Sequence, residues 1–186
     1  MKQWNNIFRK KGKVFLELQE DIPRIVSLFK KKGVKKVLDL GCGSGRHTVY
    51  LAKHNFEVYG IDIAPVGIKL TKDWLRQEHL HADLRMGSIY RKLPYKDNFF
   101  DALIAVQVIN HGKIESIRKL IKEMERILKP KGLIFITARR RILRNWLINS
   151  IKKEIFRGSN GIEILKTDYK IIGSRTYVPI EGGEKA

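Results

Sequence analysis

Short apolar runs alternate with longer amphipathic segments along most of the chain, which is the pattern of an α/β protein. Five runs are predicted as strands, and in chain order they cover residues 37–40, 56–63, 82–86, 99–108 and 133–137. The fourth is almost continuously apolar, as is typical of a strand buried on both faces of a parallel sheet. Helices are predicted between strands over residues 47–54, 64–80 and 114–128. This order favours a doubly wound, mostly parallel sheet with helices on both faces.

A helical leader is predicted in front of the first strand, within residues 1–36. Its apolar residues recur at helical spacing and are Ile22, Ile25, Val26, Leu28 and Phe29. Pro23 suits the first turn of this helix, and Gly33 is predicted to end it.

The first strand leads into a glycine-rich loop and then directly into a helix, in the sequence VLDLGCGSGR (37–46). The alternate loop positions are Gly41, Gly43 and Gly45. Glycines allow a sharp turn and a close approach of the backbone to a ligand, and the free N–H groups at a helix N-terminus can hold an electron-rich group. The spacing differs from the dinucleotide fingerprint Gly-x-Gly-x-x-Gly, because Arg46 stands where the last glycine would be. Asp62 ends the second strand, where doubly wound folds place a carboxylate that accepts from ribose hydroxyls.

The glycine loop and Asp62 occur together with PYKDNFFDALIAVQVINH (94–111) and LKPKGLIFIT (128–137). This combination, over roughly residues 34–137, resembles the class I S-adenosylmethionine-dependent methyltransferases. The resemblance implies a Rossmann-like fold, S-adenosyl-L-methionine as cofactor and a methyl-transfer activity. It implies cofactor-binding roles for Asp39, Gly41, Cys42, Gly43, Gly45, Asp62, Ile63, Ser88, Ile89, Val106 and Gln107.

The resemblance also suggests a role for individual residues. The glycines would shape the methionine and ribose pocket, and Asp62 would accept from the ribose hydroxyls. Asp39 would orient the loop or face the ammonium group of the cofactor through water. Many family members carry an acid at the position of Ser88, which accepts from the adenine amino group, and a serine hydroxyl can also accept that bond.

His111 follows the fourth strand and is the candidate general base toward the acceptor. The alternative is a hydrogen-bonded structural histidine at a strand end. The resembled family has no universal catalytic residue, because positioning the acceptor in line with the methyl group supplies most of the catalysis.

The chain ends soon after the predicted fifth strand, whereas a complete sheet of the resembled family adds an antiparallel sixth and seventh strand. We therefore expect these strands to be reduced or missing in a truncated chain, with residues 162–180 forming an extended arm or pairing with another chain. A basic amphipathic helix is predicted over residues 142–155. The chain then divides into the leader (1–36), the cofactor-binding core (37–138) and a substrate-side segment (139–186), all within one domain.

The charge of the chain is strongly unbalanced. Lys and Arg number 38 against 19 acidic residues, which gives a net charge of +19. This excess favours a polyanionic partner, although a solvated basic surface is the alternative. We expect a small-molecule acceptor, with RNA as the second hypothesis and a cofactor-binding protein without turnover as the third. A homo-oligomer is also consistent with the open sheet edge.

Cysteine content and hydropathy limit the class of protein further. Cys42 is the single cysteine in the sequence, so neither a disulfide framework nor a metal cluster is expected. No apolar run is long enough to cross a bilayer, and the N-terminus lacks the apolar core of a secretory signal. A cytoplasmic location is therefore predicted.

Overall fold

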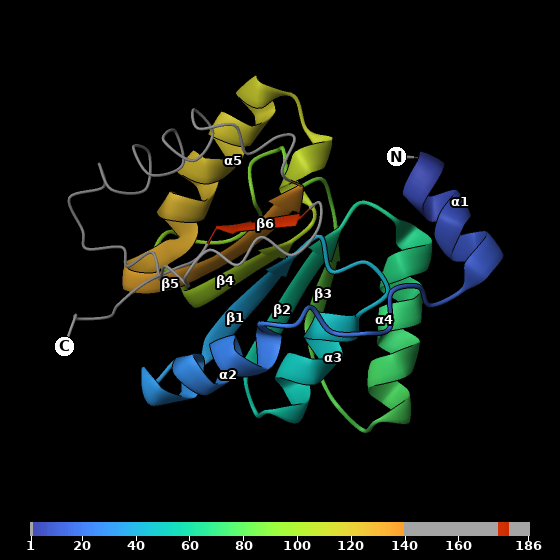
Figure 1. Cartoon of the computed structure of the whole chain (residues 1–186), viewed down its shortest axis with the longest axis horizontal. Coiled ribbons are helices and arrows are strands. Elements are labelled where there is room, and N and C mark those ends of the chain that lie inside the picture. Colours follow the sequence, from blue (N-terminus) through green and yellow to red (C-terminus); the bar gives the residue numbers. More distant parts are fainter. Residues whose placement is uncertain (1, 140–174, 179–186) are drawn as a thin grey trace. The chain divides into compact units, whose positions relative to one another are not determined.

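The computed structural model describes residues 2–139 and 175–178, which belong to two units, residues 1–89 and 90–186 (Figure 1). The first unit contains α1 (Lys2–Lys11), α2 (Ile22–Lys31), β1 (Lys36–Leu40), α3 (Arg46–Lys53), β2 (Glu57–Asp62), α4 (Pro65–Gln77) and β3 (Asp83–Met86). The second contains β4 (Phe100–Val106), the 3-10 helix η1 (Ile109–His111), α5 (Ile114–Ile127), β5 (Leu128–Arg139) and β6 (Arg175–Val178). The predicted elements from the leader helix to the fifth strand are confirmed, with shifted boundaries.

The strands of the first unit lie side by side in the order β3-β2-β1 and are all parallel (Figure 1). The pairing sets Asp39 of β1 opposite Gly60, and Asp62 of β2 opposite Met86. Because the strands are parallel, their carboxyl ends meet at one edge. The residues that follow β1 and β2 are therefore brought to the same edge of the sheet.

Helices of the first unit pack on this sheet through their apolar positions. Helix α3 contacts β1 and β2, while α4 contacts β2 and β3, and α1 lies against α4. Helix α2 joins the unit through an edge-to-face contact between Phe29 and Phe56, whose ring centroids are 6.2 Å apart. Pro23 lies in its first turn and Gly33, with φ of 69°, follows its last turn, as predicted.

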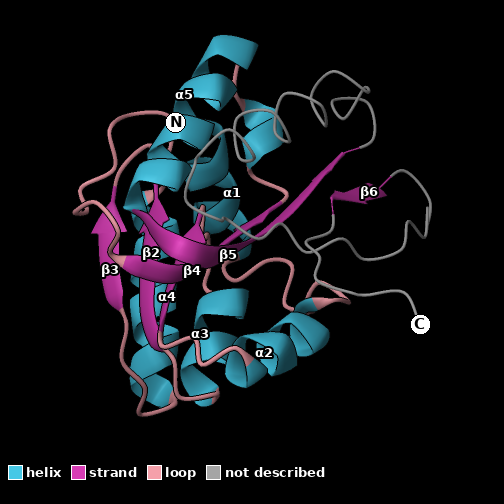
Figure 2. Cartoon of the chain, turned by 90° about the vertical axis from the view of Figure 1, so that its left-hand side faces the viewer, coloured by secondary structure: helices cyan, strands magenta, loops and turns pink. Residues whose placement is uncertain are grey.

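The second unit is built around β4, which pairs with β5 in parallel (Figure 2). Six of the seven residues of β4 are buried, as the apolar sequence predicted. Helix α5 buries one stripe of residues, namely Ile117, Leu120, Ile121, Met124 and Ile127. The predicted stripe is therefore part of the core. No helix in the described part of the chain is long and apolar enough to cross a membrane.

The fifth strand begins earlier than predicted. We expected Pro130 to Gly132 to break the chain before a strand at residue 133, but β5 already starts at Leu128. The register between β4 and β5 shifts where Phe100 pairs with Leu128 and Ala102 pairs with Leu133. A bulge of this kind accommodates extra residues without ending the strand.

The prediction that residues 162–180 leave the edge of the sheet is wrong for residues 175–178. Strand β6 lies antiparallel to β5, with Thr137 opposite Tyr177 and Arg139 opposite Arg175 (Figure 2). Four residues of the range 162–180 thus extend the sheet, where we had predicted an arm or a pairing with another chain. Strand β6 is four residues long, and the residues on either side of it lie outside the described part of the chain. The predicted helix over residues 142–155 lies outside the described residues.

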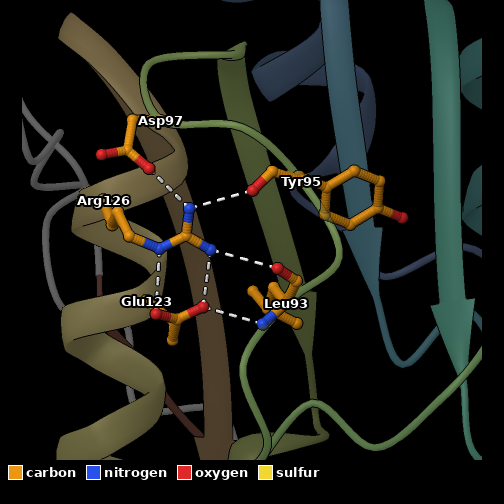
Figure 3. A network of polar contacts seen from close by, with 5 residues as sticks. All are labelled: Leu93, Tyr95, Asp97, Glu123 and Arg126. Carbon is orange, nitrogen blue, oxygen red and sulfur yellow. Dashed lines mark hydrogen bonds and ion pairs between the residues drawn. The ribbon is translucent and has the colours of Figure 1, made fainter.

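Arg126, near the end of α5, holds the segment that leads into β4 (Figure 3). Its guanidinium donates to both carboxylate oxygens of Glu123, at 2.9 and 2.7 Å. It also donates to the carbonyl oxygens of Leu93 and Tyr95 and to the carboxylate of Asp97. The Glu123 carboxylate in turn accepts from the Leu93 N–H at 2.7 Å. One side chain therefore joins a helix to three positions of a segment without regular secondary structure.

We predict that Arg126→Met lowers the free energy of unfolding by roughly 2–4 kcal/mol, because two carbonyl groups and two carboxylates lose a charged donor. Lys129→Met is the matched control, since Lys129 makes one ion pair with Asp101 and its side chain is 44% exposed. That change should cost less than about 1 kcal/mol. Urea unfolding of the two variants measures the difference. Equal losses would show that the Arg126 network contributes no more than a surface ion pair.

Candidate functional site

The carboxylate of Asp62 holds the glycine loop against the end of β2. Its Oδ2 accepts from the Gly43 N–H at 2.9 Å, and its Oδ1 accepts from the Ala64 N–H at 2.8 Å. Asp62 is buried, and the two bonds satisfy one acceptor position on each oxygen. Burial raises the pKa of Asp62, and the N–H donors of Ala64, Gly43 and Ile63 offset part of this rise. The side chain predicted as a ligand-binding acid is therefore also a structural acceptor.

The loop backbone needs glycine at its alternate positions. The φ angles of Gly41, Gly43 and Gly45 are 74°, 56° and 96°, in the left-handed region. A Cβ on Gly45 would lie only 2.7 Å from Cγ2 of Thr71, so this position also lacks space for a side chain. The loop begins by continuing the sheet, because the Gly41 N–H donates to the Ile61 carbonyl at 2.8 Å.

Helix α4 supports the other side of the loop. The Thr71 hydroxyl lies 3.0 Å from both the Gly43 and the Gly67 carbonyl oxygens. A Cβ on Gly67 would lie 2.8 Å from the Gly43 carbonyl oxygen, so glycine permits the close approach of helix and loop. Sequence reasoning missed Thr71 and Gly67, because neither belongs to a motif and both lie on a helix whose pattern predicts only packing.

Asp39 is a second buried carboxylate, one residue before the end of β1, which leads into the loop. It is 2% exposed, and its Oδ2 accepts from the Thr48 hydroxyl at 2.7 Å. Burial raises the pKa of Asp39 to about 7, against the lowering effect of the Thr48 hydrogen bond, and the nearby Asp62 charge adds to the rise. Two acidic groups thus share a poorly solvated region.

The side chain of Cys42 is buried next to the sheet. A Cβ on Gly60 would lie 3.1 Å from Cys42 Sγ, so the thiol packs where β2 has no side chain. Burial, with a smaller contribution from Asp39 and then Asp62, raises the pKa of the Cys42 thiol well above its ordinary value. A thiol in this state is a weak nucleophile, so Cys42 acts here through packing.

A segment of the leader, residues 13–19, is fastened to the glycine loop, and we call it the leader strap. The Ser44 hydroxyl accepts from the Val14 N–H at 3.4 Å and donates to the Val14 carbonyl at 3.2 Å. The buried ring of Phe8 in α1 lies near the loop as well, 3.3 Å from where a Cβ on Gly43 would be. The leader therefore covers part of the loop backbone.

Two side chains that follow the last loop glycine complete this attachment. Arg46 Nη1 donates to the carbonyl oxygens of Phe15, at 3.1 Å, and Glu17, at 2.7 Å. The Gln19 N–H donates to Nε2 of His47 at 3.4 Å. Burial lowers the pKa of His47 to about 3, so the imidazole is neutral and can accept this bond. We had noted Arg46 as a departure from the dinucleotide pattern, without assigning it a contact.

The segment after β3 approaches Asp62 through the backbone. The Gly87 N–H donates to the Asp62 carbonyl at 2.8 Å, which places Ser88 next in the chain. Ser88 is half-buried and Ile89 is buried. Ile63, directly after Asp62, is half-buried too. The structure thus brings the first-unit candidates together around Asp62.

The remaining candidates belong to the second unit. Val106 ends β4, and Gln107 follows it with φ of 57°. The Gln107 N–H donates to the carbonyl of Thr137 at 2.9 Å, and its side-chain amide lies 3.3 Å from the Thr137 hydroxyl. His111 is exposed and lies at the end of η1. These residues occupy the carboxyl end of β4, as their sequence positions predicted.

Helix η1 is held by a tyrosine that sequence reasoning did not single out. The Tyr90 hydroxyl lies 3.1 Å from the carbonyl oxygens of Val108 and Ile109. A Cβ on Gly112 would lie 2.5 Å from the Tyr90 ring, so glycine is required there. Among the described residues, no group of three or more His, Cys, Asp or Glu side chains could hold a metal ion.

We predict that Asp39→Asn stabilises the protein at about pH 8 and has little effect at about pH 4. The raised pKa means that folding takes up a proton between about pH 4 and pH 7, so stability falls as the pH rises through this window. An amide avoids the charge and can still accept from Thr48, and the expected gain at pH 8 is roughly 1–4 kcal/mol. Urea unfolding at both pH values measures it.

Asp73→Asn is the control for this comparison. A hydrogen bond from Lys69 lowers the pKa of Asp73, so its charge is favourable and its removal should give no gain at pH 8. An Asp39→Asn variant with the same stability change at both pH values would contradict the account of a buried, protonatable Asp39.

The known proteins that this chain resembles in sequence include methyltransferases with different acceptors. A family model described as a methyltransferase domain matches residues 38–136. The ubiquinone biosynthesis O-methyltransferase of Idiomarina loihiensis is 26% identical over 120 residues, which cover 64% of this chain and 49% of that protein. The ribosomal RNA small subunit methyltransferase C of Alcanivorax borkumensis is 25% identical over 58% of this chain and 33% of its own length. The chain spans about half the length of the ubiquinone biosynthesis relatives that it matches.

Solved structures agree with the predicted fold. The PH0226 protein of Pyrococcus horikoshii matches 96% of this chain, and 99% of that protein, with a TM-score of 0.65 and 22% identity. The Rossmann-like α/β fold expected from the sequence is therefore confirmed.

Proposed function

Because the chain belongs to the methyltransferase domain family, we propose that it transfers a methyl group from S-adenosyl-L-methionine to a small-molecule acceptor. Family membership implies S-adenosylmethionine as the cofactor. The single observation that carries the proposal is the Asp62 carboxylate, which binds the Gly43 N–H at the end of β2. This joins the acid expected to bind ribose to the loop expected to receive the cofactor.

The residues around Asp62 fit such a ligand chemically. The two carboxylate oxygens can together accept about four hydrogen bonds, and the backbone donors to them are the N–H groups of Gly43, Ala64 and Ile63. Asp62 therefore keeps acceptor capacity for a ribose hydroxyl. The buried carboxyl of Asp39 lies in β1, just before the same loop, and a cationic ligand there would favour its ionised form over its protonated form.

The chain's own contribution to the reaction is mainly orientation. When bound, S-adenosylmethionine supplies a methyl group on a sulfonium sulfur, which keeps the bonding electrons as the acceptor attacks the methyl carbon in line. The glycine loop, held by Asp62 and Thr71, would fix the cofactor so that the methyl group has one direction. Orientation of two reactants can supply about 7–11 kcal/mol of the barrier reduction.

Other candidates receive roles in this proposal. Ser88 and the Ile89 backbone would contact the adenine, since Gly87 lies hydrogen-bonded to the Asp62 carbonyl. Val106 and Gln107 would border the methionine part of the cofactor, and His111 would remove the acceptor proton.

The proposal of a small-molecule acceptor rests on the relatives, and the cofactor chemistry does not bear on it. The name of one relative refers to ubiquinone biosynthesis, which favours a small molecule. RNA is the second candidate, favoured by the net charge of +19 and by the ribosomal RNA methyltransferase among the relatives. A protein that binds the cofactor without turnover is the third. A salt-sensitive RNA mobility shift would favour the second, and release of S-adenosylhomocysteine with any acceptor would exclude the third.

We predict that Asp62→Ala weakens the binding of S-adenosylmethionine by roughly ten- to a hundredfold, because charge-assisted hydrogen bonds worth roughly 1.5–3 kcal/mol are lost. Isothermal calorimetry with the wild type, Asp62→Ala and the control Asp73→Ala, a half-buried carboxylate paired with Lys69, measures the loss, and the control should bind normally. A wild type that binds nicotinamide dinucleotides and gives no heat with S-adenosylmethionine would make the assignment wrong.

A second prediction concerns the adenine side of the site. If Ser88 faces the adenine amino group, Ser88→Asp should keep or improve affinity, because a carboxylate is a stronger acceptor than a hydroxyl. The measurement is the dissociation constant of S-adenosylhomocysteine, with a thermal melt to show normal folding. A folded Ser88→Asp variant that binds far more weakly would show that Ser88 does not face the amino group.

A further inference from the structure

Two adjacent apolar side chains on the leader strap are exposed. Phe15 is 63% exposed and Leu16 is 56% exposed, and we call this pair the apolar tip. The half-buried ring of Trp4 lies next to the tip, with its centroid 6.4 Å from that of Phe15. Large apolar side chains that gather on a surface mark a contact with another apolar phase. Elsewhere in the described residues, Met86 is the other large hydrophobic residue with comparable exposure, and it lies apart from the tip in sequence, at the end of β3.

The backbone of the apolar tip is held in a conformation that a bulky residue rarely adopts. Phe15 has φ of 54°, in the left-handed region. Arg46 donates to the carbonyl oxygens of Phe15 and Glu17, on both sides of Leu16. These bonds hold backbone atoms, the Arg46 guanidinium lies 5.9 Å from the Phe15 ring centroid, and the side chains of Phe15 and Leu16 stay exposed. A strained backbone that neighbouring groups hold in place is a feature of binding sites.

The leader that carries the tip is strongly basic. Residues 1–36 contain eleven Lys and Arg against three acidic residues. Lys10, Lys11 and Lys13 precede the tip and are exposed, and Lys13 lies 4.4 Å from the Trp74 ring centroid. Glu17 is an exposed acid next to the tip, so the positive charge comes from the α1 side and from Arg46. An apolar pair beside several lysines is suited to bind a surface that carries anionic groups over an apolar layer.

We propose that the leader strap docks the protein on an anionic bilayer surface, with Phe15 and Leu16 inserted at the boundary between headgroups and acyl chains. Lys10 and Lys11 would contact lipid phosphates while their alkyl stems lie along the interface. Leu16 has no π face on which a nucleobase could stack, which favours a bilayer over RNA as the occupant. This docking goes beyond the proposed methyl transfer and does not depend on it.

The docking would bring the cofactor loop close to the bilayer. Ser44, Arg46 and His47 bind the strap through its backbone, and all three lie within the glycine loop or in the two residues after it. The strap and the loop are therefore parts of one hydrogen-bonded assembly within the first unit. A contact between the tip and lipid fixes the distance of the loop from the surface.

The test is co-sedimentation of the full chain with vesicles of phosphatidylcholine alone and with vesicles that also contain phosphatidylglycerol. The wild type should sediment with the anionic vesicles. Phe15→Ser/Leu16→Ser should partition roughly tenfold more weakly or worse, since two apolar side chains no longer insert. Met86→Ser is the matched control for loss of an exposed apolar side chain and should bind as the wild type does.

A second variant separates charge from insertion. Lys10→Gln/Lys11→Gln should weaken binding to anionic vesicles. It should leave the contribution of Phe15 and Leu16 to that binding unchanged. Because both tip residues are exposed, the Ser/Ser variant should melt at the wild-type temperature, and the vesicle assay then reports docking alone. A wild type that stays in the supernatant with anionic vesicles, or a Ser/Ser variant that binds them equally well, would overturn the proposal.

Two other results would assign the tip to a different partner. If the Ser/Ser variant loses binding to a polyuridine probe while vesicle binding is unchanged, the tip contacts RNA. If analytical ultracentrifugation shows a dimer for the wild type and a monomer for the variant, the tip contacts a second copy of the chain. Either result with unchanged vesicle binding overturns bilayer docking.

Discussion

The Asp62 carboxylate accepts from the N–H groups of Gly43 and Ala64, and these two hydrogen bonds connect β2, the glycine loop and the start of α4. The loop can then turn through three left-handed glycines, and Thr71 of α4 can reach the Gly43 carbonyl from the opposite side. Without the carboxylate, two N–H groups in a poorly solvated region would lack their acceptor. The position of the loop, and of the strap fastened to it, depends on this one acid.

The same arrangement concentrates negative charge where water is scarce. Asp39 and Asp62 are both buried, and each has a raised pKa whose largest cause is burial. Such a pair lowers the stability of the protein at neutral pH, because a buried acid near a second acid resists ionisation. A core built for stability alone would have no need of two acids. In the proposed function this charge has a use, since the ligand that the loop would receive is cationic at sulfur.

Much of the fold could be predicted from the sequence, because strand hydrophobicity and helix periodicity are local signals. The glycine loop and Asp62 were found for the same reason, as a strand, a turn and a helix follow one another in the chain. The contacts of Thr71, Ser44 and His47 could not be predicted, since each bridges segments far apart in sequence. Pro130 suggested a break, but a strand can absorb it through a bulge when its partner strand is buried.

The leader shows a second limit of sequence reasoning. Its basic and apolar residues predict a helix, but no pattern reveals that Arg46 and His47 hold the strap through its backbone. Nor does the sequence indicate that Phe15 lies exposed at a positive φ, because aromatic residues more often pack inside. Both the attachment of the strap and the exposure of Phe15 depend on contacts between segments that are distant in sequence.

The central claim is that the loop from Gly41 to Gly45 receives S-adenosylmethionine, and glycine-selective 15N labelling tests it most directly. The chain has 15 glycines, so each amide can be followed in a two-dimensional NMR spectrum during a titration. The account predicts that the signals of Gly41, Gly43 and Gly45 shift saturably, while that of Gly33, which lies past the end of α2, stays in place. Saturable binding that leaves the three loop signals unchanged would contradict it.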